Sequence, residues 1–214
     1  MARPVRITLT PDAADADGIS TSQTPAAGGE QNLTITGAFA SGGVATMDLG
    51  RRVLITAAAD ETSRTFTITG TNHSGVVISE AVTGPNATTA SSVKDYLTVT
   101  QVTVDDDTTG AVTVGTSGVL STQWVQPNIH ASPFNIGFGV EVSGTIAFDV
   151  EHTFSDLELS AAPTVFNHAA VAAQTANVDD NYAFPVAGYR LTINSFTAGA
   201  SVTLAALQAG ISSN

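Results

Sequence analysis

Clustered carboxylates are the residues best suited to chemistry in this sequence, because hard cations such as calcium prefer carboxylate oxygens. Asp12, Asp15 and Asp17 stand close together, and three further aspartates occupy residues 105–107. An EF-hand loop needs a bidentate glutamate near its twelfth position. The nearest glutamate, Glu30, lies thirteen residues after Asp17 in a glycine-rich stretch. We therefore expect both clusters to be solvated turns that bind no metal.

The four histidines offer no metal-binding pair, since none lies within four residues of another and zinc sites use closely spaced ligands. One of them, His152, continues the alternation of apolar residues from Ile146 to Phe154 and so falls on the apolar face of a predicted strand. We expect it to be a core or interface histidine. The others are His73, His130 and His168.

The sequence also lacks a recognisable set of residues for nucleophilic or acid–base catalysis. The chain has no cysteine, and its nearest approach to a Gly-x-Ser-x-Gly elbow, residues 115–118, is one residue short and resembles a polar linker. Glu141 and Glu151 lie on the polar sides of two predicted strands, but a sugar cleft would need more aromatic residues around them. We expect both to be solubilising charges on an outer face. We predict a non-enzymatic protein with no catalytic residues, no cofactor and no metal.

Composition narrows the class of protein further. The 214 residues are 43% hydrophobic and 12% charged, which indicates a folded chain. Seven basic residues against 19 acidic ones give a net charge of −12, so no basic surface is available to bind nucleic acid. No apolar run is long enough for a membrane span or a secretory signal. We expect a product made in the host cytoplasm, with no nucleic acid or membrane as partner.

Short runs rich in Thr, Val and Ile, separated by Gly, Pro, Asn and Asp, predict an all-β protein of the antiparallel β-sandwich or jelly-roll type. Residues 65–83 have the pattern of a hairpin. The apolar phase changes across Gln101, which indicates a β-bulge. Residues 134–142 and 146–154 alternate clearly, and we expect them to pair as antiparallel neighbours with Phe154 in the core.

The organisation along the chain suggests two small β domains and an arm. Residues 1–29 are predicted to be an N-terminal strand and extended arm, because residues 11–29 are too polar and glycine-rich to enter a core. We expect this arm to extend across a neighbouring subunit. Residues 30–123 would form an N-terminal β domain and residues 124–214 a C-terminal β-sandwich domain.

Three stretches resemble virion structural proteins of tailed bacteriophages: residues 80–115, which open EAVTGPN, residues 132–156, which open SPFNIG, and residues 181–194, which open NYAFPV. Within that group the chain looks most like a capsid cement, or decoration, protein. The resemblance implies a homo-oligomer, for which we expect a trimer, bound to the major capsid protein on the capsid exterior. It implies no active site.

The few basic residues are the candidates for capsid contact. An acidic chain that meets an acidic shell has only a few positive groups to offer, and we expect Arg3, Arg6, Arg51 and Arg52 to serve. Each could instead balance nearby acidic groups of its own subunit. The alternative functions are a phage tail or fibre component, or a glycan-binding adhesin-like module.

Overall fold

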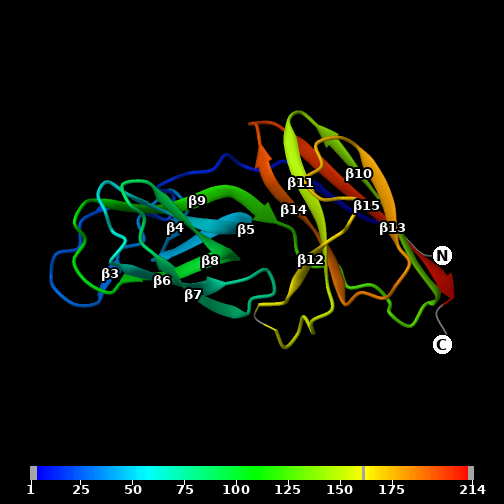
Figure 1. The fold of residues 1–214 in the computed structure, drawn as a ribbon, viewed down its shortest axis with the longest axis horizontal. Helices are drawn as coiled ribbons and strands as arrows, with labels where there is room; N and C mark the ends of the chain where they lie inside the picture. The colour runs from blue at the N-terminus through cyan, green and yellow to red at the C-terminus, as the bar shows by residue number, and fades with distance from the viewer. Residues whose placement is uncertain (1–3, 161, 212–214) are drawn as a thin grey trace. The chain divides into compact units, whose positions relative to one another are not determined.

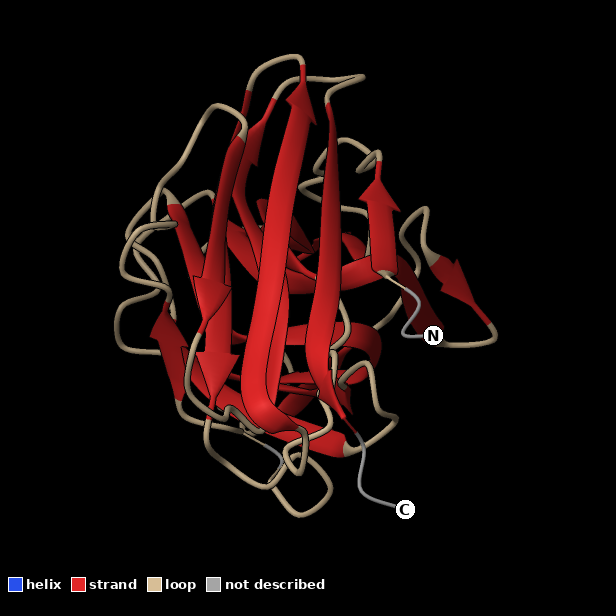
Figure 2. Ribbon diagram, turned by 90° about the vertical axis from the view of Figure 1, so that its right-hand side faces the viewer, coloured by secondary structure: helices blue, strands red, loops and turns tan. Residues whose placement is uncertain are grey.

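The computed structural model describes residues 4–160 and 162–211. These residues form strands joined by turns and loops, and Figure 2 shows no helix among them. No helix in this described part of the chain could therefore cross a membrane. The predicted all-β, antiparallel class is confirmed. The reason is that β-branched residues favour the strands, while Gly, Asn and Asp favour the turns.

The chain divides into two compact units, which are described separately. The middle unit comprises Ala14–Leu120. The terminal unit joins Met1–Ala13 to Ser121–Asn214, so the first strand of the chain belongs to the same unit as the last (Figure 1).

A sheet with the order β9-β5-β8-β6-β7 forms the middle unit, with β2 beside β9, β3 beside β8 and β4 beside β5. Its core holds the buried residues of alternating strand positions, among them Val53, Phe66, Tyr96 and Val102. The strands are β2 (Ser20–Gln23), β3 (Gln31–Leu33), β4 (Ala40–Ser41), β5 (Val44–Ala57), β6 (Thr65–Thr71), β7 (Val77–Thr83), β8 (Thr89–Val104) and β9 (Val112–Ser121).

Two local predictions for the middle unit are confirmed. The hairpin exists as β6 and β7, which pair antiparallel from Thr65 opposite Thr83 to Thr71 opposite Val77. The bulge lies in β8, where Thr69 pairs with Gln101 but the next residue, Gly70, pairs with Val99. The extra residue in β8 explains the change of apolar phase.

Two other predictions for this unit are wrong. Ile19 lies in the stretch expected to stay outside the core, yet it is fully buried, and its amide donates to the Val114 carbonyl at 3.0 Å. Residues 115–118, expected to be a linker, lie inside β9. A Cβ on Gly115 would stand 2.0 Å from the Asp15 carbonyl oxygen, so this glycine permits close contact between two backbones rather than flexibility.

The terminal unit is a sandwich of a four-stranded sheet, β1-β15-β10-β13, and three consecutive strands of the larger sheet, β12-β11-β14. Buried side chains of both sheets meet between them, including Phe138 and Leu204 from the first and Phe148 and Leu191 from the second. The strands are β1 (Val5–Leu9), β10 (Ser132–Ser143), β11 (Ile146–Thr153), β12 (Val165–Asn167), β13 (Val178–Tyr182), β14 (Gly188–Phe196) and β15 (Ser201–Ile211).

The expected pairing of the two alternating strands is wrong, although the expected burial of their apolar faces largely holds. β10 pairs with β13 and β15, whereas β11 pairs with β12 and β14. The short turn at Gly144, which has a φ of 82°, therefore leads from one sheet of the sandwich to the other. Phe154 follows the end of β11 and is 56% exposed, so it is not a core residue.

The first strand, β1, pairs with another strand of the same chain. Val5 to Leu9 lie antiparallel to Ala206 to Val202 of β15. β1 thus pairs within its own subunit, whereas the arm is predicted from the sequence to extend across a neighbouring subunit.

Candidate functional site

Two of the four arginines expected to contact a capsid, Arg3 and Arg6, are near the N-terminus. Arg3 lies outside the described residues. Arg6 is exposed on β1, at one edge of the four-stranded sheet of the terminal unit.

The other two arginines are adjacent on β5 of the middle unit but differ in environment. Arg51 is only 1% exposed, and its Nη2 donates to Asp48 Oδ2 at 2.8 Å. The side chain of Arg52 is 36% exposed, and its Nε lies 3.7 Å from Asp95 Oδ1. Arg51 is therefore part of the interior, while Arg52 reaches the surface as one member of a loose ion pair.

The carboxylates of the acidic turn at residues 105–107 accept hydrogen bonds from neighbouring segments. Asp107 Oδ1 accepts hydrogen bonds from the Gly28 amide at 2.7 Å and from Gln31 Nε2 at 2.8 Å. Asp105 Oδ1 accepts from the Thr65 amide at 3.0 Å. Within the described residues, no group of three or more His, Asp or Glu side chains is placed to hold a metal ion.

His152 lies at the centre of a cluster of rings in the terminal unit, as a core histidine should. It is 7% exposed, and its ring centroid lies 5.2 Å from that of Tyr182 and 5.3 Å from that of Phe154. His168, also buried, stands edge-on to Tyr182 at 4.8 Å. The expectation that His152 is a core residue is confirmed.

Burial shifts the titration of this cluster. Desolvation, together with the charge of nearby His168, lowers the pKa of His152 below its ordinary value. Desolvation raises the pKa of Tyr182 well above 10, and it raises the pKa of Tyr189 to about 12. The interior of the unit therefore favours neutral rings.

The outer edge of the ring cluster is open to solvent. Phe154 follows β11, Phe166 belongs to β12 and Phe184 follows β13, and these three side chains are 56%, 46% and 46% exposed. Ring centroids lie 5.7 Å apart for Phe154 and Phe166 and 6.2 Å apart for Phe154 and Phe184. We call these three residues the aromatic surface.

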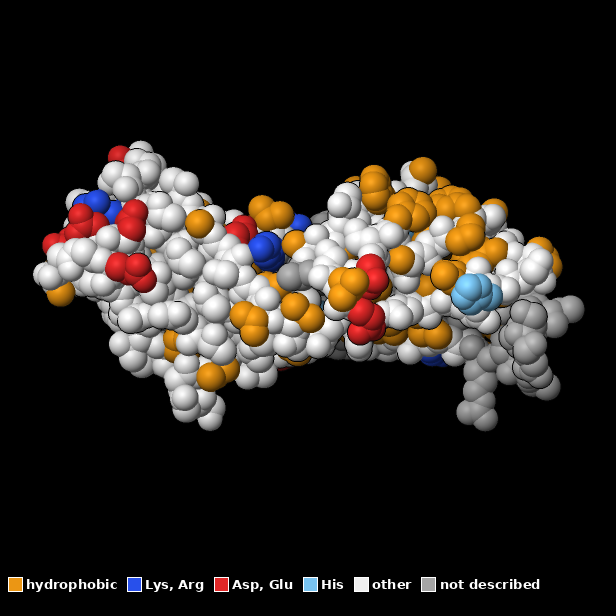
Figure 3. All heavy atoms as spheres, turned by 90° about the horizontal axis from the view of Figure 1, so that it is seen from below, with side chains coloured by type: hydrophobic (Ala, Val, Ile, Leu, Met, Phe, Trp, Pro, Cys, Tyr) orange, Lys and Arg blue, Asp and Glu red, His pale blue; other side chains and the backbone are white. Residues whose placement is uncertain are grey.

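An aromatic surface of this kind is typical of a protein-binding site, because interface cores are enriched in aromatic residues and monomers rarely expose contiguous apolar patches. Figure 3 shows one face of the molecule on which hydrophobic side chains gather over the terminal unit. Sequence reasoning missed this surface, since its members come from three separate segments. The sequence signal at Phe154 was misleading, because the alternation of residues 146–154 placed it in the core.

A buried ion pair fastens the other side of β11. Arg190 donates from Nε to Glu151 Oε2 at 2.7 Å, and Thr192 Oγ1 donates to the same oxygen at 2.7 Å. The guanidinium of Arg190 also lies 4.6 Å from the ring centroid of Trp124. Glu151 was expected to be a solubilising surface charge, but it is 7% exposed and structural.

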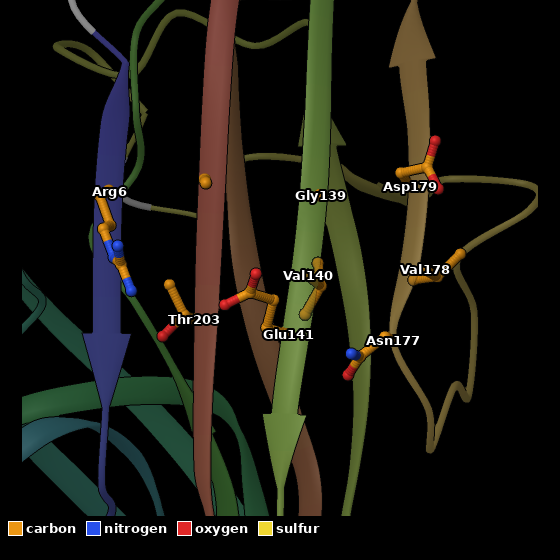
Figure 4. A pocket seen from close by; sticks show the side chains of 9 residues that line it. Arg6, Gly139, Val140, Glu141, Asn177, Val178, Asp179 and Thr203 are labelled. Atoms are coloured by element: carbon orange, nitrogen blue, oxygen red, sulfur yellow. The ribbon is translucent and has the colours of Figure 1, made fainter.

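A second open surface covers the outer face of the four-stranded sheet. A hollow of about 330 Å³ lies here, with Gly139 of β10 in its lining. Figure 4 shows the residues that line it. Charged groups of both signs border it: Arg6 from β1, Glu141 from β10 and Asp179 from β13. The hydroxyl of Thr203, a buried polar side chain in the lining, already pairs with the Thr8 hydroxyl at 2.9 Å.

Comparison with protein-family models finds no matching family, and comparison with curated proteins finds no match. Among solved structures, the chain matches the major capsid protein P2 from bacteriophage PM2. The TM-score is 0.21 and the sequence identity 9%, over 98% of this chain and 99% of that chain. A TM-score of this size does not establish a common fold, and no function is transferred from this match.

Proposed function

We propose that this chain is a structural protein of a tailed-phage virion, a cement protein that binds the outside of the icosahedral shell and stabilises it. The resemblance of residues 80–115, 132–156 and 181–194 to such virion proteins supports the proposal. So does an architecture of strands that offers open surfaces for docking.

The aromatic surface is the observation that carries the proposal. Fully burying a phenylalanine side chain contributes about 1.5–3 kcal/mol. Phe154, Phe166 and Phe184 are about half exposed, so a partner that covers them would gain a substantial part of that free energy. A shell repeats its binding position many times. Modest contacts of this kind add up when a homo-oligomer engages several of those positions at once.

Charge would tune the docking. A net charge of −12 keeps free copies soluble. Arg52, which reaches the surface of the middle unit, is the positive group that we assign to an acidic shell. This contact should weaken as salt is added, whereas the contact of the aromatic surface should not.

A trimer is the oligomer that fits local three-fold positions of such a shell. Each subunit would then present the same patch to one capsomer edge. The trimeric state stays a prediction, as does binding to the major capsid protein.

Labelling the protein in purified virions tests the proposal. Electron microscopy of virions decorated with gold-coupled antibody should place the label over the head, in a regular pattern. Label found only on tails would contradict the cement role and would favour the alternative, a tail or fibre component.

A further inference from the structure

The outer face of the four-stranded sheet in the terminal unit carries a basic residue on one edge strand and an acidic residue on the other. One row of paired positions crosses all four strands: Arg6 opposite Ala205, Ala205 opposite Gly139, and Gly139 opposite Asp179. With strands about 4.8 Å apart, the two charged residues are separated by about 14 Å of flat sheet. In the described part of the chain, neither Arg6 nor Asp179 forms an ion pair.

The next row carries a protrusion and a gap. Leu207 of β15 is 50% exposed and pairs with Gly137 of β10. A Cβ on Gly137 would meet no atom within 4 Å, so nothing in this chain requires a glycine there. Glycine inside a strand is unfavourable, and it often marks a place where another chain approaches closely. A hollow of about 400 Å³ lies over this part of the face.

We propose that this face binds the same face of a second copy of the chain, around a two-fold axis that runs along the strands midway between β10 and β15. That axis exchanges β10 with β15, and β1 with β13, across the contact. Arg6 then faces Asp179 of the second copy, and Asp179 faces its Arg6. Leu207 likewise faces Gly137 of the second copy, so each protrusion enters a gap.

The charge pattern explains why the occupant is a second copy. A two-fold contact needs a surface complementary to itself, and opposite charges at the two ends of one row satisfy that condition. Packed sheets align their strands to within about 30°, which keeps these rows in register. The inference concerns the isolated chain and does not depend on the proposed role in a virion.

The area of the face sets the expected strength. Strands of twelve, eleven, five and five residues, with a rise of about 3.4 Å per residue, cover roughly 500 Å² of sheet in each copy. Stable interfaces bury about 800 Å² per partner. We therefore expect a reversible association that depends on protein concentration and weakens with salt.

Charge reversal tests the proposal sharply. Arg6→Asp and Asp179→Arg each bring like charges together at both ends of the contact. Each variant alone should raise the dissociation constant about tenfold or more. An equal mixture of the two variants should recover association, because every end of the contact then carries one arginine and one aspartate. The double variant should recover it as well.

Sedimentation velocity over a range of concentrations gives the readout. Gly137→Val should also prevent association while leaving the fold intact, since its side chain points into open space. The matched control is Glu30→Arg, an exposed acidic residue of the middle unit whose reversal should change nothing. Circular dichroism checks that every variant is folded.

Three outcomes would overturn the inference. They are a wild-type chain that stays monomeric at high concentration, charge-reversed variants that associate as well as the wild type, and a mixture that fails to recover association. A trimer whose mass is changed by neither charge reversal would also overturn the inference, because its contact would use another surface. None of these results would bear on shell docking, because a monomer or a trimer could still bind a shell through the aromatic surface.

Discussion

The Tyr182 hydroxyl lies 3.4 Å from Nδ1 of His152, in a contact buried between the two sheets of the terminal unit. Tyr182 comes from β13 and His152 from β11, so this contact joins one sheet to the other. The same two rings lie beneath the aromatic surface. The state of this contact therefore affects both the stability of the unit and the support of the proposed docking site.

The first prediction concerns acid. In the unfolded chain His152 has its ordinary pKa of about 6.5, whereas burial lowers its pKa in the folded chain. Between these values the unfolded state binds a proton that the folded state does not. The free energy of unfolding should therefore decrease as the pH falls through about 6.5, and level off below the folded pKa.

Urea unfolding at several pH values between about 5.5 and 7.5 measures this decrease around the ordinary histidine pKa. His152→Phe should make it smaller, because a ring without a proton site remains in the cluster. His130→Gln, at an exposed position, should leave it unchanged. An unaltered pH dependence in His152→Phe would show that His152 does not carry the effect.

The second prediction concerns base. All three tyrosines of the chain are buried and have raised pKa values, that of Tyr189 about 12. Unfolded tyrosine ionises near pH 10, so stability should be lost as the pH rises above about 10. In the folded protein, ultraviolet titration should show almost no tyrosinate at about pH 10.5. Ionisation of one tyrosine near its ordinary pKa would mean that its ring reaches solvent.

The third prediction separates core rings from surface groups. Phe148 is fully buried between the sheets, so Phe148→Ala should lower the free energy of unfolding by about 3–5 kcal/mol. Phe154→Ala should lower it by much less, because that ring is 56% exposed. Glu141→Gln should have almost no effect, since the residue is exposed. Similar losses for all three, measured by urea unfolding, would contradict this arrangement of the sandwich.

Local features of the fold could be predicted because their determinants are contiguous in the sequence. The β6–β7 hairpin has both strands and its turn within residues 65–83, and the bulge in β8 appears as a change of apolar phase at Gln101. His152 was placed on the correct face by the alternation of a single strand. In each case neighbouring residues hold the information.

Long-range pairing could not be predicted from the same signals. The alternation in β10 and β11 is equally consistent with two paired strands and with two strands in opposite sheets, and the second is observed. Glu151 looked like a surface charge because its partner, Arg190, lies on β14 and is distant in the sequence. The aromatic surface forms only when three segments meet, so no window of the sequence contains it.

The fourth prediction concerns the aromatic surface. Replacing Phe154 and Phe166 by Ser should reduce binding to empty phage heads that lack this protein, at low and at high salt alike. Leu159→Ser is the matched control, because Leu159 is 86% exposed and is not a member of the aromatic surface. Cosedimentation with the heads gives the bound fraction. Equal binding by the double variant and the control would show that another surface docks.

Arg52→Ser gives the complementary result. Its loss should remove part of the salt dependence of head binding and leave the binding at high salt unchanged, because exposed charge pairs are already screened there. The same cosedimentation assay over a series of salt concentrations shows the difference. A salt dependence identical to that of the wild type would exclude Arg52 from the contact.

The temperature at which virions release their DNA tests the cement role most directly. Virions with and without this protein would be heated in parallel, with a dye that fluoresces on free DNA. Heads without the protein should release DNA at a lower temperature. Adding back the wild-type chain should restore the higher temperature, whereas the Phe154 and Phe166 double variant should not. Release at the same temperature in all samples would contradict the cement role.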